Sequence, residues 1–132
     1  MQPKTTLTIA SIIGLIFSSA MFLAPEFVTR EQFPNSEGQG FVDLVTLRYA
    51  IASLILALVI ISYHLRDITG HAFQIHVMRG YTLAFGVVCI TNLALQLTGK
   101  ISAVPPIVGT GVIAVLSLLT WRSVVSRTKE EA

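Results

Sequence analysis

Hydrophobic residues are gathered into four runs that together occupy more than half of the 132-residue chain. The runs extend over about Thr5–Ala24, Tyr49–Leu65, Tyr81–Thr98 and Pro105–Trp121, with few charges inside them. Each run approaches the ~20 residues with which an α-helix crosses ~30 Å of hydrocarbon. Because a helix satisfies its own backbone hydrogen bonds in lipid, the pattern predicts four transmembrane helices.

Turn-forming residues set the limits of these helices. Pro25 is expected to end the first helix, and Pro25–Gly40, which holds a Pro-Asn pair and two glycines, is expected to be an irregular outer loop. The second helix is expected to begin near Phe41. Pro105 and Pro106 suit the first turn of the fourth helix, where N–H groups have no acceptor within the helix. The prediction is an all-α, integral membrane four-helix bundle that forms a single domain over 1–132, with helices at about 5–24, 41–65, 72–98 and 102–121.

Composition supports a membrane protein. The chain is 53% apolar and 12% charged, with a mean hydropathy of +0.74. A soluble domain of this composition would have more apolar surface than one core could hide. The formal net charge of +2 is too small to suggest a nucleic-acid partner. Cys89 is the only cysteine, so no intrachain disulfide forms.

The first run also has the parts of a secretory signal peptide. Lys4 precedes an apolar stretch that ends with the small residues Ser18-Ser19-Ala20. The four-pass arrangement uses this run as its first helix, and we expect it to be retained.

Basic residues are divided unevenly between the two sides of the membrane. Four passes place the N-terminus, the middle loop and the C-terminus on one side, which holds six Lys or Arg residues against two on the other. Because cytoplasmic loops carry the excess of Lys and Arg, we expect both termini in the cytoplasm, with the chain in a bacterial inner membrane. Tyr63, Tyr81 and Trp121 fall at the same boundary, as an interfacial aromatic belt would. The six basic residues are Lys4, Arg66, Arg79, Arg122, Arg127 and Lys129, and the two are Arg30 and Lys100.

Small residues form a continuous face on the first helix. Ala10, Gly14 and Ser18 follow one another at intervals of four residues. Such a face lets another helix backbone approach closely in lipid. We expect it to pack against a helix of the same chain, and an oligomer interface is the alternative.

Polar side chains from three helices are expected to lie at one depth beneath the outer face. Arg48, Asn92 and Ser18 each lie seven residues from the expected outer end of their helix, about 10 Å at 1.5 Å per residue. Gln96, one turn above Asn92, and Asp43 extend this candidate polar layer towards the outer water.

Arg48 is the most costly member of this layer. An arginine that faces lipid inside a span costs about 2.5 kcal/mol or more, so we expect Arg48 to face the bundle interior, with Asn92 as its likeliest embedded partner. Gln96 and the loop acids Glu26, Glu31 and Glu37 are the other candidate partners. Two interpretations stay open: a structural clasp that holds helix register, or a site for a ligand, a quinone headgroup or a proton.

Three histidines surround the predicted loop between the second and third helices: His64, His71 and His76. Imidazoles on facing helices are able to ligate haem or a metal. No cysteine or carboxylate cluster completes a zinc set, and no nucleophile stands beside a base. We therefore predict no metal, no cofactor and no catalysis, with haem or quinone binding as the alternative.

Short motifs in the first half of the chain resemble a known group of proteins. The pattern Gly14-x-x-Phe17, then Phe22-x-x-Pro25, then Leu47-Arg48-Tyr49 is similar to that of uncharacterised bacterial four-helix membrane proteins, loosely akin to DoxX-like proteins. The resemblance covers about half of the chain and implies the four-helix fold. The second half departs from it, because Asn92 stands where those proteins often have arginine and the fourth helix has no embedded acid.

Two functions follow from these features. The first is a small non-catalytic integral membrane protein, an accessory or scaffold subunit whose partners are membrane lipid and other integral membrane subunits. The alternative is a carrier or redox-linked protein that binds a small molecule or quinone in the outer-leaflet polar layer.

Overall fold

The computed structural model describes residues 2–130, with side chains described through residue 128. The side chain of Lys129 and all of Ala132 therefore lie outside the described part. Within that part the chain is all-helical. It forms α1 (Pro3–Leu23), α2 (Pro25–Gln32), α3 (Gly38–Leu65), α4 (His71–Leu97) and α5 (Val104–Glu130). Four of these helices, α1, α3, α4 and α5, are long and apolar enough to cross a membrane.

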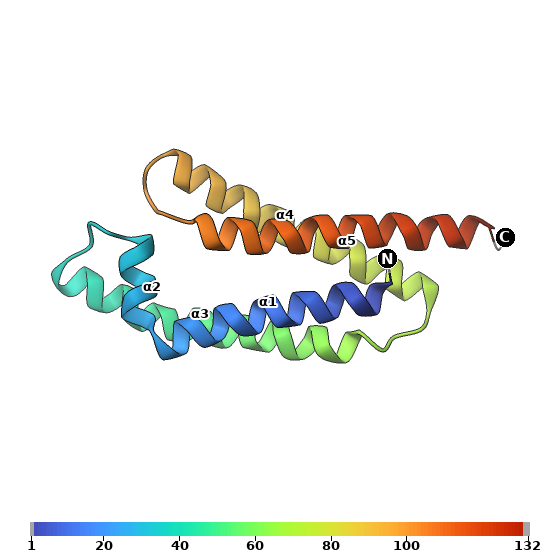
Figure 1. The fold of residues 1–132 in the computed structure, drawn as a ribbon, viewed down its shortest axis with the longest axis horizontal. Helices are drawn as coiled ribbons and strands as arrows, with labels where there is room; N and C mark the ends of the chain where they lie inside the picture. The colour runs from blue at the N-terminus through green and yellow to red at the C-terminus, as the bar shows by residue number, and fades with distance from the viewer. Residues whose placement is uncertain (1, 131–132) are drawn as a thin grey trace.

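The four long helices form two packed pairs. α1 lies along α3, and α4 lies along α5, as Figure 1 shows. The pairs meet chiefly where α1 contacts α5. The start of α1, the end of α5 and the α3–α4 connection lie at one end of the bundle, which we call the termini end (Figure 1). α2 and the α4–α5 connection lie at the other end, the α2 end.

The expectation of an irregular loop over Pro25–Gly40 is wrong for its first half, which forms α2. Pro25 occupies the first turn of α2, where its missing N–H costs nothing. Glu26 in the first turn and Arg30 in the last turn suit the helix dipole. The chain bends sharply at Ala24, so α2 runs across the end of the bundle instead of extending α1 (Figure 1). Proline thus ends one helix and begins the next.

α3 and α5 are both longer than predicted. α3 begins at Gly38, whose φ of 59° is readily adopted by glycine, and it includes the residues before Phe41. α5 continues to Glu130, well beyond the expected end at Trp121. The residues after Trp121 are mostly polar but contain no proline or glycine, so the helix continues where the apolar run stops. For α5, the hydrophobic pattern therefore predicted the apolar part of the helix but not its full length.

The small-residue face of α1 packs against α3 within the chain. Ala10 is buried, and the Ser18 hydroxyl donates to the Ala52 carbonyl oxygen at 3.1 Å. A Cβ atom added to Gly14 would lie 2.6 Å from a methyl carbon of Val59. Since carbon atoms pack at about 3.5–4.0 Å, only glycine permits this approach. The face therefore serves contact between two helices of one chain.

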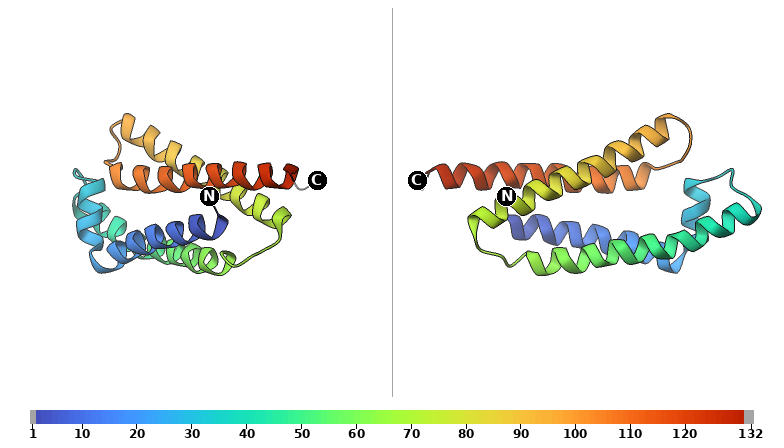
Figure 2. Two further views of the ribbon diagram at one scale, coloured as in Figure 1. Left: turned by 45° about the vertical axis from the view of Figure 1, so that its right-hand side comes forward. Right: turned by 180° about the vertical axis from the view of Figure 1, so that it is seen from behind.

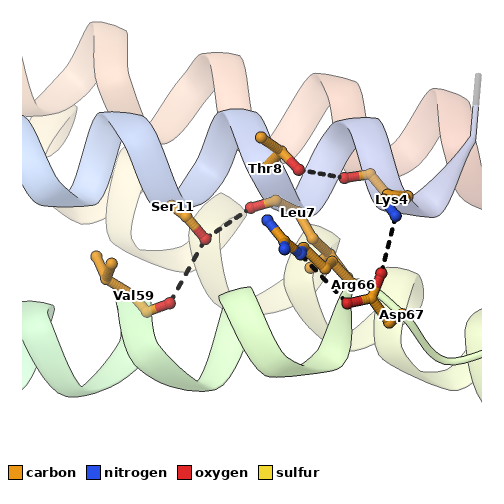
Figure 3. Close-up of polar contacts among 7 residues, drawn as sticks. All are labelled: Lys4, Leu7, Thr8, Ser11, Val59, Arg66 and Asp67. Atoms are coloured by element: carbon orange, nitrogen blue, oxygen red, sulfur yellow. Dashed lines mark hydrogen bonds and ion pairs between the residues drawn. The ribbon is translucent and has the colours of Figure 1, made fainter.

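Polar contacts join α1 to α3 towards the termini end, as Figure 3 shows. The Ser11 hydroxyl donates to the Leu7 carbonyl oxygen at 2.9 Å and lies 3.5 Å from that of Val59 on α3. The Lys4 ammonium lies 2.9 Å from an Asp67 carboxylate oxygen. This ion pair is exposed, so it contributes little to stability. It still holds the pKa of Asp67 below its ordinary value.

Candidate functional site

A cavity of about 650 Å³ lies between the two helix pairs. All four long helices line it, together with residues at the end of α2 and in the α4–α5 connection. Its walls are mostly apolar, and its volume falls in the range of about 300–1,000 Å³ that small-molecule sites occupy. Ile13, Phe17, Ile51, Ile55 and Ile113 are among the apolar side chains that line it.

The cavity exists because α3 and α4 diverge. Near the termini end the hydroxyl groups of Ser62 and Tyr81 form a partly buried hydrogen bond between these helices. Towards the α2 end the two helices separate, as both views in Figure 2 show. The other side is closed: a Cβ on Gly109 of α5 would lie 2.6 Å from the Phe17 ring, so α1 and α5 approach closely there. The cavity is therefore closed on the side where α1 and α5 pack together and more open on the side between α3 and α4.

Arg48 is the principal polar group of this cavity. The residue is only 5% exposed although it carries a charge. Its Nε donates to the Thr29 hydroxyl at 3.3 Å, and its guanidinium carbon lies 5.5 Å from the centre of the Phe33 ring. The Nη2 nitrogen is buried and has no hydrogen-bond partner among the described residues. A buried cationic donor is thus left without an acceptor at the wall of an apolar cavity.

Thr29 and not Asn92 accepts the hydrogen bond from Arg48. Thr29 is fully buried on α2, and its hydroxyl donates in turn to the Pro25 carbonyl oxygen at 2.7 Å. Asn92 lines the same cavity, but its side-chain nitrogen donates to the Val88 carbonyl oxygen of its own helix. Arg48 and Asn92 lie at the same depth along their helices, which is why the sequence predicts that they interact. Their helices, α3 and α4, diverge, and the two side chains form no hydrogen bond with each other. None of the loop acids pairs with Arg48 in the described part of the chain.

The other residues of the predicted polar layer lie outside the cavity wall. Ser18 is bound to the α3 backbone, as described above. The Gln96 side-chain oxygen accepts a hydrogen bond from the Ala103 N–H at 3.3 Å, across the α4–α5 connection. Asp43 accepts from the Gln39 side chain at 2.9 Å on the surface of α3. The structure therefore brings Arg48 and Asn92 to one cavity, whereas Ser18, Gln96 and Asp43 form hydrogen bonds outside it.

Sequence reasoning missed two groups that define the site. The sequence pattern predicts a loop at Thr29, and nothing in it marks this residue as an arginine partner. Lys100 was counted only as a topology signal, yet it also lines the cavity. One sequence feature singles it out: Lys100 is one of only two basic residues assigned to the outer side. Among the residues that line the cavity are two cations and no Asp or Glu.

The α2 end of the cavity is covered by backbone contact. The Ser102 N–H donates to the Gln32 carbonyl oxygen at 2.9 Å, which ties the α4–α5 connection to the end of α2. Gln32, Phe33 and Ile101 line the cavity beneath this contact. The two helix pairs, which diverge here, are thus bridged by α2 and not by helix packing.

None of the three histidines lines this cavity, although His76 lines a smaller adjoining pocket that shares Leu58, Phe85 and Val88 with it. His64 packs edge-on against Tyr63, with ring centres 5.8 Å apart, near the termini end. In the part of the chain that the structure describes, no group of three or more His, Cys, Asp or Glu side chains is placed to hold a metal ion.

Comparisons with models of protein families, with curated proteins and with solved structures found no match to this chain. The resemblance to DoxX-like proteins stays a prediction.

Proposed function

We propose that this chain is an integral membrane protein that binds a small molecule in the cavity between its helix pairs, as a carrier does. Arg48 recognises the polar end of that molecule. The observation that carries this proposal is the Arg48 Nη2, which is buried without a partner at the wall of an apolar cavity.

The unpaired donor argues against a purely structural clasp. A buried donor without an acceptor costs about 1–3 kcal/mol, and more when it is charged. An arginine retained for register would be expected to satisfy its donors on neighbouring helices, whereas Arg48 has a single hydrogen bond in the described chain. A ligand oxygen beside Nη2 would supply the missing acceptor, and this charge-assisted hydrogen bond would strengthen binding of the ligand.

The position of Arg48 suits a membrane-embedded site. It lies ten residues from the start of α3 at Gly38, about 15 Å along the helix at 1.5 Å per residue. A ligand that contacts Arg48 would have its remaining atoms against the apolar side chains deeper in the cavity.

The orientation of the chain is part of this proposal. The termini end carries the larger number of basic side chains, which favours its placement in the cytoplasm. Arg48 would then lie in the outer half of a bacterial inner membrane.

The accessory-subunit function is the second candidate, and one observation favours it. Apolar side chains on α3 and α4 are exposed where these helices diverge, among them Leu47 and Val88, which are 52% and 45% exposed. A helix of another membrane subunit would bury them.

Native mass spectrometry of the chain purified in mild detergent distinguishes the two functions. We expect a small-molecule adduct on the isolated chain, lost from Arg48→Gln and kept in Arg66→Gln. Arg66 is a matched control because it lies at the termini end, where it contacts Asp67 and the Tyr63 ring. A stoichiometric protein partner with no small-molecule adduct would refute ligand binding and support the accessory function.

A further inference from the structure

Resting on the proposed function, we infer that the ligand is an anionic amphiphile, with a carboxylate or phosphate head at Arg48 and an apolar body, and that it enters from the lipid between α3 and α4.

The charges of the cavity select an anion. Arg48 and Lys100 both line it, and no carboxylate is among the lining residues. Neither cation forms an ion pair with a described acid. Coulomb attraction is stronger in the low-dielectric surroundings of a buried site, and hydrogen bonds between a guanidinium and an anionic oxygen are the stronger kind. An anionic head therefore gains most from these two cations, and a cationic head would be repelled.

The shape of the cavity selects an elongated apolar body. On α3 alone the lining residues run from Leu44 to Ser62, a distance of about 27 Å at 1.5 Å per residue. Apart from Arg48 and Ser62, the lining residues of this helix are aliphatic. A small inorganic anion would leave these walls without contact, whereas an acyl chain would cover them.

The route of entry follows from which sides are covered. The α2 end is bridged by the Ser102–Gln32 backbone hydrogen bond, with Phe33 beside Arg48. On the opposite side of the cavity α1 and α5 are in close contact. Between α3 and α4 the helices diverge (Figure 2), and the cavity-lining Leu47 and Val88 are about half exposed. This lateral opening would face acyl chains in a bilayer.

The head charge is tested with dansyl-undecanoic acid as a fluorescent probe and its uncharged methyl ester as the matched control, on the chain in phosphatidylcholine nanodiscs. We expect saturable binding of the acid, weakened about tenfold or more by Arg48→Gln, as the loss of one charge-assisted hydrogen bond predicts. Lys100→Gln should weaken the acid less, because Lys100 is exposed. Neither substitution should change binding of the ester, and Arg66→Gln should change neither probe.

Failure of this inference and failure of the proposed function give different results. If acid and ester bind the wild type equally and Arg48→Gln affects neither, the cavity binds ligands but the anionic head is refuted. If neither probe binds the wild type saturably, the proposed function fails as well. Competitors identify the source of the head: displacement by phosphatidylglycerol in the nanodisc and not by butyrate or inorganic phosphate supports a lipid-borne amphiphile. Displacement by butyrate or phosphate alone would overturn the requirement for an apolar body.

The lateral route is tested with the rate of probe entry in stopped-flow fluorescence. Val88→Trp places a large ring beside the opening, whereas Ile90→Trp places the same ring on a different face of α4, at a residue that does not line the cavity. We expect Val88→Trp to slow both association and dissociation of the acid probe, as an obstructed route does, with Ile90→Trp unchanged. Equal rates in the two variants would refute entry between α3 and α4.

Discussion

Replacing Arg48 with methionine separates a ligand-binding arginine from a structural one. Methionine keeps an unbranched side chain of adaptable shape and removes the charge with all of its donors. In the ligand-free protein, the structure predicts that this substitution will not weaken the bundle, although it changes the most polar group of the interior.

The magnitude follows from the contacts of Arg48. Its one hydrogen bond, to Thr29, is 3.3 Å long, beyond the usual value of about 3.0 Å for N–H···O, so its loss costs about 1 kcal/mol. Removal of the unpaired Nη2 returns about 1–3 kcal/mol, the cost of a buried unsatisfied donor. We therefore expect Arg48→Met to leave the free energy of unfolding between unchanged and about 2 kcal/mol higher.

The measurement is reversible unfolding in mixed detergent micelles, followed by helical circular dichroism as the fraction of sodium dodecyl sulfate rises. The preparation must be free of ligand, because a ligand that binds the folded wild type would raise its apparent stability. The same variant should lose binding of the anionic probe, so stability and function should change in opposite directions.

Thr29→Val provides the matched comparison. It removes the acceptor while the buried charge stays, so it should cost about 1–3 kcal/mol. Added to Arg48→Met, the same substitution should cost less, with a coupling of about 0.5–2 kcal/mol. Asn92→Val combined with Arg48→Met should be additive, because the two side chains share no hydrogen bond. A loss of more than about 3 kcal/mol in Arg48→Met with unchanged probe binding would show that Arg48 is a structural clasp and refute the reasoning.

Three further predictions concern packing, acid stability and orientation. Gly14→Ala should cost about 1–3 kcal/mol in the same unfolding assay, because its new Cβ would lie 2.6 Å from a methyl carbon on α3. Gly86→Ala, whose new Cβ would have no atom within 4 Å apart from the nearby backbone of its own helix, should be neutral or gain up to about 1 kcal/mol, and a similar loss at both glycines would contradict the α1–α3 contact. Since Lys4 lowers the pKa of Asp67 from 3.8, the ion pair stabilises the fold above that pH and is lost as the pH falls through the lowered pKa. Acid unfolding of Asp67→Asn should therefore show a slightly weaker pH dependence than that of the wild type, and an identical pH dependence would count against the ion pair. A reporter fused after Ala132 should be cytoplasmic, and an external reporter would reverse the proposed orientation.

The sequence by itself determined the candidate spans and the packing face of α1. The length and apolarity of four runs identified four helices that are able to cross a membrane, because this property depends on consecutive residues along the chain. The i, i+4, i+8 spacing of small residues identified a close-packing face for the same reason. Neither property requires knowledge of which helices are neighbours.

Only the tertiary structure decided the site. The partner of Arg48 depended on the position of α2, an eight-residue helix within a segment that the sequence pattern predicts to be an irregular loop. Depth along each helix placed Arg48 and Asn92 at one level, but depth does not determine the separation of α3 and α4 at that level. The cavity, its two cations and its lateral opening arise from that separation, which is set by α1–α3 and α4–α5 packing together. Periodicity describes one helix at a time, whereas a cavity depends on how several helices lie relative to one another.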